Sequence, residues 1–436
     1  MGQKVLDVHE KPDALKWLVL SMQHMFAMFG ATILVPTLVG LSPAMALLTS
    51  GLATFIFIAV TRFQVPAYLG SSFAFIAPML HAIEIGGVGG TMVGIIFVSF
   101  AYAIISLIIW KTGHRWIMNV LPPIVVGPVI VVIGLGLAPT AINMASMIPV
   151  FDNAGVQVGE AYSLLHFSAA AVTLLTAVIV LMFFKGLISL MPVIMGIVVG
   201  YIYAFFIGIV DFTAVKEAAW FQIPDFYIPG IHYDFVITPE ILTLLVPVII
   251  VTVSEHIGHQ LVLGRVVGKN FIEEPGLHRS LLGDGLGTLI SGLVGGPPKT
   301  TYGENIGVLA MTRVYSVYVI LGAAFFAVIF SFVGKAMALI STIPTAVLGG
   351  VSILLFGMIA AAGLRMLVEH QIDFDQQRNL VIASVILVVG VGGATLKFMI
   401  PFIDIRIELG GMALAAIVGV LLNLVLPGRV KEHTIE

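Results

Sequence analysis

The architecture of the chain depends on two short stretches, AYLGSSFAFIAPML (residues 67–80) and TTYGENIGVLAMT (residues 300–312). Each is about half as long as the roughly 20 apolar residues that a membrane-spanning helix needs. Each also mixes Gly and hydroxyl residues with apolar ones. Irregular backbone at membrane depth is tolerated only where protein buries it or where it lines a cavity. We therefore expect both stretches to be broken segments inside a membrane protein.

The rest of the chain supports a membrane protein. Of its 436 residues, 59% are hydrophobic and only 10% are charged, against about 25% charged residues in an ordinary soluble domain. A soluble enzyme is excluded, and the net charge of −3 provides no basic surface for nucleic acid. Twelve full-length spans are predicted at approximately 15–36, 43–62, 90–111, 120–143, 165–184, 187–210, 240–264, 280–296, 314–336, 344–363, 379–396 and 408–427.

The positive charges indicate that both short stretches also cross the membrane, which makes fourteen segments. With fourteen crossings, 15 of the 20 Lys and Arg residues, Lys4, Arg429 and Lys431 among them, lie on the side of the termini. The positive-inside rule then places both termini in the cytoplasm. Only five residues lie on the opposite side: Lys216, Lys299, Lys335, Lys397 and Arg406.

The two halves of the chain echo one another. Three matched pairs lie 232, 233 and 222 positions apart: Gln23-His24 with Glu255-His256, Gly70-Ser71 with Gly303-Glu304, and Leu121-Pro122 with Ile343-Pro344. A chance echo between low-complexity sequences is the alternative. Seven segments per half would place the second copy upside down in the membrane, a pattern found in secondary transporters with broken helices at the substrate site. We expect an all-α integral membrane protein with a seven-plus-seven inverted repeat, whose two broken segments each form a strand plus a half-helix at mid-membrane.

Three acidic residues fall well inside the predicted segments, where a charge by default marks function: Glu255, Asp284 and Glu304. His259 follows Glu255 by one helical turn, so the two share a face and could form a proton relay, or could simply pair with partner helices. Asp284 is interpreted mainly as a helix-packing or capping group that water can reach. His256 points away from Glu255 and is interpreted as a packing residue.

The broken segments offer hydrogen-bond donors to a ligand. A half-helix that begins at mid-membrane exposes unpaired N–H groups and the positive end of its dipole. Glu304 adds an acceptor at one such end, and Ser71, Ser72 and Phe73 occupy the other. Small-residue helix packing is the alternative for this serine motif. A small flat molecule with donors and acceptors would fit, and Phe73 could stack on it.

Two other polar residues are interpreted as structural, and the sequence lacks the motifs of several kinds of chemistry. Gln23 and His24, in the middle of the first span, are expected to form an interhelical hydrogen bond. The chain has no cysteine, no phosphate-binding Walker loop and no HExxH motif, so thiolate chemistry, ATP-driven transport and metalloprotease chemistry have no candidate residues.

These motifs resemble the nucleobase–ascorbate transporter family (nucleobase:cation symporter-2), most closely its bacterial uracil-permease branch. The resemblance covers both halves of the chain. It rests on QHMFAMFGATILVP (23–36), VPAYLGSSFAFIAP (65–78), Pro122-Pro123, SEHIGH (254–259), PGLHRSLLGDGLGT (275–288) and TTYGENIGVLAMTR (300–313). The family signature corresponds to Glu304-Asn305-Ile306-Gly307 followed by Thr312-Arg313. One departure from the uracil branch is Asp284, where Asn is familiar, which leaves the proton stoichiometry open.

The resemblance implies a core domain of residues 15–113 and 240–336 and a gate domain of residues 118–212 and 343–427. It implies that uracil is bound by the Glu255 and Glu304 side chains, by backbone N–H groups of Phe73 and Gly303, and beside Tyr302 and His259. Proton coupling is implied for Glu255, His259 and Glu304. We also expect Ser72 to contact the substrate, and Gln23, His24 and Asn305 to give structural support.

We accordingly expect a proton-coupled uracil importer of the bacterial inner membrane, a homodimer among membrane lipids that needs no cofactor or metal and has H⁺ as its coupling ion. Neutral uracil suits such a site, because a carboxylate accepts from ring N–H groups and a protonated carboxyl also donates to a carbonyl. A carrier of xanthine or another nucleobase is the first alternative. An anion transporter or channel of related fold, which two membrane carboxylates disfavour, and a membrane enzyme follow.

Overall fold

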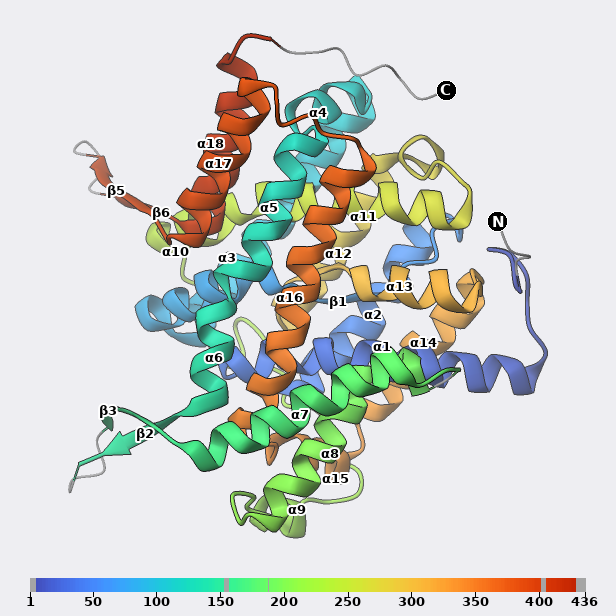
Figure 1. Ribbon diagram of the computed structural model, residues 1–436, viewed down its shortest axis with the longest axis vertical. Helices are drawn as coiled ribbons and strands as arrows, with labels where there is room; N and C mark the ends of the chain where they lie inside the picture. The colour runs from blue at the N-terminus through green and yellow to red at the C-terminus, as the bar shows by residue number, and fades with distance from the viewer. Residues whose placement is uncertain (1–4, 153–156, 187, 401–404, 429–436) are drawn as a thin grey trace.

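The computed structural model of the chain describes residues 5–152, 157–186, 188–400 and 405–428. Lys4, Arg429 and Lys431, which contribute to the predicted charge asymmetry, lie outside these residues, as do positions 401–404 of the predicted gate domain. The first half runs through α1 (Ala14–Val39), α2 (Pro43–Val60), β1 (Leu69–Ser71), the 3₁₀ turn η1 (Phe73–Phe75), α3 (Ile76–Thr112), α4 (Arg115–Val120), α5 (Pro123–Gly136), α6 (Ala138–Ser146), β2 (Met147–Phe151), β3 (Gln157–Tyr162), α7 (Leu164–Phe183), η2 (Ile188–Leu190) and α8 (Pro192–Phe206) (Figure 1).

The second half repeats this pattern of helices, with one short three-residue strand and one two-stranded hairpin. It runs through α9 (Thr213–Glu217), α10 (Pro239–Leu245), η3 (Val246–Val248), α11 (Ile249–Val267), η4 (Ile272–Gly276), α12 (Leu277–Val294), β4 (Lys299–Thr301), α13 (Gly303–Thr312), α14 (Val317–Ser331), α15 (Gly334–Ser341), α16 (Thr345–Glu369), α17 (Gln377–Val391), β5 (Thr395–Ile400), β6 (Ile405–Gly410) and α18 (Gly411–Val425).

Each of the predicted full-length spans overlaps one or more helices, and the spans at 379–396 and 408–427 also include residues of the strands β5 and β6. Among the described residues, seven helical stretches are long and apolar enough to cross a membrane, and α8, α14, α17 and α18 are shorter apolar helices. α12 is different, because it carries Asp284 and several glycines among its apolar residues. The fold is that of a many-helix integral membrane protein.

Both short stretches have the expected strand followed by a helix, and the two strands pair with each other. β1 and β4 run antiparallel, with Leu69 opposite Thr301 and Ser71 opposite Lys299. Hydrogen bonds from Ser72 N–H to the Pro298 carbonyl (2.9 Å) and from Tyr302 N–H to the Tyr68 carbonyl (3.1 Å) extend the ladder. Each half of the chain thereby satisfies backbone groups that the other half leaves open, as an interior without water requires.

Three features differ from the expectations. The helix that begins within the stretch at 67–80 runs on to Gly86 and Gly87, whose backbones are not helical, and the helix of the span at 90–111 follows directly after this kink in α3. Two β-hairpins, β2–β3 and β5–β6, interrupt the otherwise helical chain. Strands of five or six residues are too short for a search based on helix-length apolar windows to detect.

The third difference concerns Lys299, which the charge pattern placed at the membrane surface opposite the termini. The structure instead buries it completely within β4. β4 pairs with β1 and packs on α12 and α11, and the Lys299 side chain turns inward and reaches Ala46 and Ser50 of α2.

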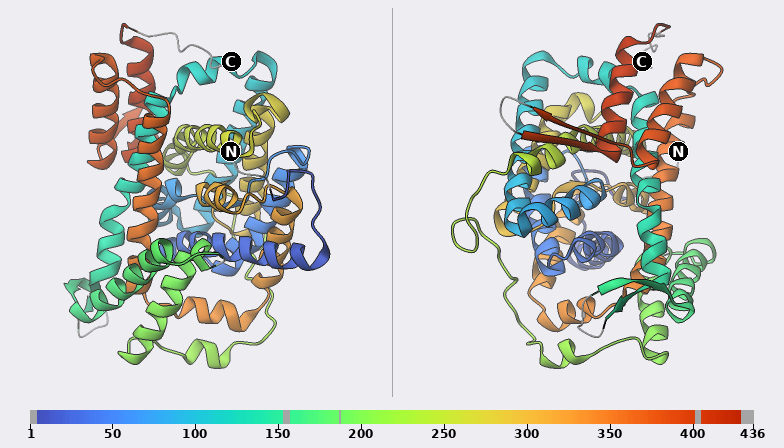
Figure 2. Two further views of the ribbon diagram at one scale, coloured as in Figure 1. Left: turned by 45° about the vertical axis from the view of Figure 1, so that its right-hand side comes forward. Right: turned by 90° about the vertical axis from the view of Figure 1, so that its left-hand side faces the viewer.

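The helices pack in two groups. In one, α16 contacts α5, α6, α7 and α8, while α17 packs on α18 and α5; in the other, α2 contacts α12, α14 and α1, and α3 packs on α12 and α10. Figure 2 shows the teal and orange-red helices of the first group beside the blue and yellow helices of the second. α11 contacts α13 on one side and α5 on the other, so the residues of α11 lie where the groups meet.

Candidate functional site

The two half-helices begin next to each other at the paired strands. α13 starts at Gly303, and the turn η1, which continues into α3, starts at Phe73. The residues before them, Tyr302 and Ser72, have extended backbones, and neither side chain caps its helix within the described part of the chain. Their first N–H groups are therefore available to a ligand.

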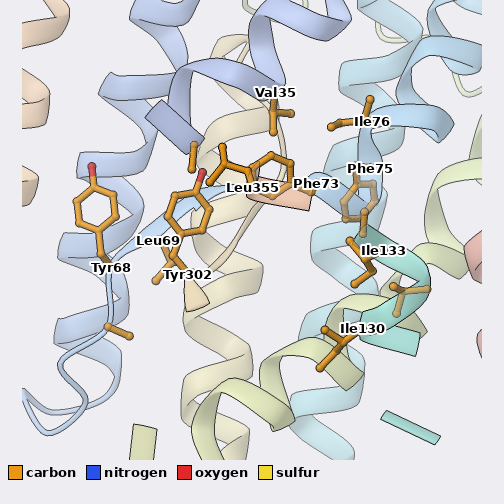
Figure 3. Close-up of a cluster of buried hydrophobic side chains, with 14 of the residues drawn as sticks. Val35, Tyr68, Leu69, Phe73, Phe75, Ile76, Ile130, Ile133, Tyr302 and Leu355 are labelled. Atoms are coloured by element: carbon orange, nitrogen blue, oxygen red, sulfur yellow. The ribbon is translucent and has the colours of Figure 1, made fainter. Parts of the chain in front are cut away.

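Two aromatic rings lie where the two half-helices begin. The Phe73 and Tyr302 rings stack with centroids 6.4 Å apart and an interplanar angle of 27°, and they lie side by side in Figure 3. The Tyr302 hydroxyl donates to the Ser71 carbonyl at 3.2 Å. Gly70 packs directly against the Tyr302 ring, where any side chain would overlap it. Phe73 also meets Phe356 of α16 edge to face at 5.8 Å, so the site touches both helix groups.

The side of α11 that carries Glu255 and His259 faces α13. An atom in the Cβ position of Gly303 would lie 3.0 Å from His259 Nε2, and His259 Nδ1 is 3.3 Å from the Thr301 hydroxyl. Glu255 is 6% exposed, and its Oε2 has no partner within the described residues. Glu304 lies in the first turn of α13 and close enough to interact electrostatically with Glu255. The structure thus brings together Glu255, His259, Gly303 and Glu304 from two separate elements.

The predicted support residues divide into two cases. His24 Nε2 lies 2.7 Å from Asn305 Oδ1, and Asn305 Nδ2 donates to the Pro66 carbonyl at 3.0 Å. Since Asn305 Oδ1 only accepts, His24 carries its proton on Nε2. The expected interhelical bond is therefore present for His24 and holds α13. Gln23 is buried at 6% exposure, but its Oε1 has no partner in the described part of the chain. Ser72 is also buried, and its hydroxyl has none there either.

Sequence reasoning missed a buried acid–base pair behind the strands. His256 Nδ1 lies 2.7 Å from Asp284 Oδ2, His256 Nε2 lies 2.8 Å from the Ser280 hydroxyl, and all three side chains are fully buried. His256 is thus more than a packing residue, and Asp284 is closed to water. The Thr301 hydroxyl approaches both His256 (3.5 Å) and His259 (3.3 Å), which connects the pair to the site.

The pair had a signal in the sequence. His256 and Asp284 lie on the consecutive helices α11 and α12 and are equally far from Asn270 in the connection between them, so a close approach of these two helices would bring the two residues together. No group of three or more His, Asp or Glu side chains in the described residues is arranged to hold a metal ion.

Comparison with known proteins agrees with these features. The model of the Permease family matches residues 15–398. The chain is 60% identical to the uracil permease of Bacillus caldolyticus (98% of this chain, 96% of the relative), 54% to that of Bacillus subtilis strain 168 (98% and 96%) and 42% to that of Escherichia coli strain K12 (98% and 94%).

The fold is also found in distant membrane transporters. The transmembrane domain of the cyanobacterial bicarbonate transporter BicA superposes with a TM-score of 0.61 at 12% identity, over 94% of this chain and 96% of that one. The murine solute carrier 26 member A9 anion transporter, in its inward-facing state, gives 0.63 at 10% identity, over 95% and 69%. Since the family model covers most of the chain and close relatives cover nearly all of it, the chain belongs to the Permease family.

Proposed function

We propose that this permease imports uracil together with protons across the bacterial plasma membrane. The observation that carries the proposal is the identity of 42–60% to three proteins named uracil permease, extending over 98% of the chain. As a member of a permease family, the chain is a transport protein and not an enzyme.

The arrangement of the site supports uracil as substrate. The free N–H groups at Phe73 and Gly303 would donate to the uracil carbonyl oxygens, and the carboxyls of Glu255 and Glu304 would accept from its ring N–H groups. The stacked rings of Phe73 and Tyr302 provide an apolar wall beside a flat base. Ser72 has a buried hydroxyl with no described partner, which is available to a polar ligand.

Proton coupling follows from the same groups. A protonated carboxyl both donates and accepts, whereas an ionised one only accepts, so the protonation of Glu255 or Glu304 changes the affinity for uracil. By linkage, bound uracil changes the proton affinity to the same extent. His259, which lies next to Gly303 and Thr301, would exchange a proton with the two carboxyls.

The proposal includes the finer topology. Fourteen segments in two inverted sets of seven would form a core domain of residues 15–113 and 240–336 and a gate domain of residues 118–212 and 343–427. The two packing groups of helices and the pairing of β1 with β4 support this division. The site would then be exposed alternately to each side as one domain moves against the other. We further propose that the transporter is a homodimer with both termini in the cytoplasm.

Uptake of radiolabelled uracil into proteoliposomes, with and without an imposed inward proton gradient, tests the function. Gradient-dependent accumulation above the outside concentration is expected. Equal final levels of uracil with and without the gradient would support uracil as the substrate and contradict proton coupling. Absence of uptake by folded protein would contradict uracil as substrate, and competition by xanthine, other nucleobases and bicarbonate would then identify the cargo.

A further inference from the structure

Lys299 is a buried basic residue with no task in the site described above. It opens β4, opposite Ser71, and its side chain has no exposed surface. It is the only Lys or Arg that is buried among the described residues. An ammonium group is strongly hydrated, so its removal from water costs free energy, and such a residue in a membrane segment indicates a specific task.

The partners of this ammonium group are neutral oxygens. Nζ donates to the Ala46 carbonyl at 3.1 Å and to the Ser50 hydroxyl at 3.0 Å, one turn apart on α2. Within the described residues, Lys299 forms no ion pair with a carboxylate, and the buried Asp284 is paired with His256 instead. A positive charge on this amine would therefore be held by dipoles alone.

The backbone of Lys299 is held as well. Its N–H donates to the Thr288 hydroxyl of α12 at 3.1 Å, and the same hydroxyl donates to its carbonyl at 3.3 Å. β4 is thus tied to α12 by its backbone and to α2 by the lysine side chain. Gly303, the first residue of α13, lies four residues farther along the chain, so this attachment positions the N–H groups of the site.

Carbonyl and hydroxyl oxygens are ligands that small hard cations prefer. We propose that Ala46 and Ser50 form a cation site that the chain fills with its own ammonium, and that Lys299 is a positioning residue which holds β4 and the start of α13 in their binding geometry without a bound metal ion. The effect on substrate binding rests on the proposed function. The cation site itself does not.

Substitutions of Lys299 separate its charge from its bulk. Lys299→Met keeps most of the volume and removes the charge, and we expect it to fold and to bind uracil about tenfold more weakly. Lys299→Ala leaves a gap with the shape of 1-propylammonium, the fragment that the substitution removes. This cation, present from solubilisation onward, should raise the melting temperature of Lys299→Ala and restore its uracil affinity, whereas neutral 1-propanol should do neither.

Matched controls make the result decisive. Lys111→Ala, which removes an exposed lysine at the end of α3, should show neither loss nor rescue. Uracil affinity of Lys299→Met equal to that of the unchanged protein would overturn the proposal, as would equal effects of 1-propylammonium and 1-propanol on Lys299→Ala. If Lys299→Ala does not fold, Ser50→Ala takes its place, and unchanged uracil affinity in that variant would overturn the proposal.

The test also separates this inference from the proposed function. If the unchanged protein binds no uracil, the proposed substrate is wrong. The melting temperature of Lys299→Ala with 1-propylammonium still decides whether the cation site exists.

Discussion

Glu304 joins two properties in one residue, because it carries a carboxyl group and lies in the first turn of a helix whose N–H groups have no side-chain cap. We expect Glu304→Ala to weaken uracil binding about 10- to 150-fold, since a charge-assisted hydrogen bond contributes about 1.5–3 kcal/mol. Glu304→Gln should keep part of the binding and lose the response to a proton gradient, because an amide does not titrate. Equilibrium binding and gradient-driven uptake measure the two effects. Normal proton-driven accumulation by Glu304→Gln would exclude a coupling role for Glu304.

The His256–Asp284 pair leads to a prediction about stability. Asp284→Ala leaves His256 Nδ1 without its buried partner, and it should destabilise the protein by about 3 kcal/mol. Asp284→Asn keeps an acceptor in the same place and should cost less, about 1 kcal/mol. Thermal unfolding in detergent ranks the two variants. Asp211→Asn is the control, since its carboxyl lies exposed in a loop and bonds only to Thr213 within the described residues. Asp284→Ala as stable as this control would show that the pair contributes nothing to stability.

The carboxylate of Asp211 lies in an exposed loop, in contrast to the buried carboxylate of Asp284. Two hydrogen bonds from Thr213, from its hydroxyl and its backbone N–H, lower the pKa of Asp211 below its usual value. Because the folded state favours the ionised form, any stability from these bonds is present at neutral pH and is lost as the pH falls through the lowered pKa. Neutral pH therefore keeps the control residue charged in both the folded and the unfolded protein.

The half-helix α13 provides a matched pair of glycines, Gly303 and Gly307, four residues apart. A methyl group at Gly303 would lie 3.0 Å from His259 Nε2, whereas one at Gly307 would meet no atom within 4 Å. Gly303→Ala should therefore weaken uracil binding about tenfold by displacing His259 or the start of α13. Gly307→Ala should leave binding unchanged and stabilise the helix by about 0.5–1 kcal/mol. Isothermal titration with uracil measures both. Equal affinities of the two variants would show that the contact between α11 and α13 is not part of the site.

At the scale of the whole molecule, the absence of cysteine from the sequence makes the proposed topology testable. A single introduced cysteine is then the only thiol in the protein. Lys216→Cys, in the exposed helix α9, should react with a membrane-impermeant maleimide in intact cells. Lys111→Cys, exposed at the end of α3, should react only after permeabilisation. Labelling of both in intact cells, or the reverse pattern, would contradict fourteen crossings with cytoplasmic termini.

Much of the architecture was predictable because the membrane imposes it. The apolar runs predicted the helices, since a chain in hydrocarbon must satisfy its backbone within each segment. The two stretches at 67–80 and 300–312 were recognisable as strand plus half-helix because they are too short and too rich in Gly and hydroxyl groups to be spans. Ionisable residues are rare in membrane segments because a charge there costs free energy. Glu255, His259 and Glu304 were therefore candidates for function.

What the sequence did not reveal depends on contacts between segments distant along the chain. The pairing of β1 with β4, the bond between His24 and Asn305, and the inward turn of Lys299 toward α2 each join residues more than 200 positions apart. Such contacts depend on which helices pack against each other and at which angle. Apolar patterns do not reveal this packing, because residues that face lipid and residues that face protein are alike in composition. The sequence therefore determined that the chain is a membrane protein, where its helices lie and which acidic residues lie inside them. These properties depend locally on the transfer of side chains out of water. The assembly of those residues into one site was decided by the tertiary packing of the two halves.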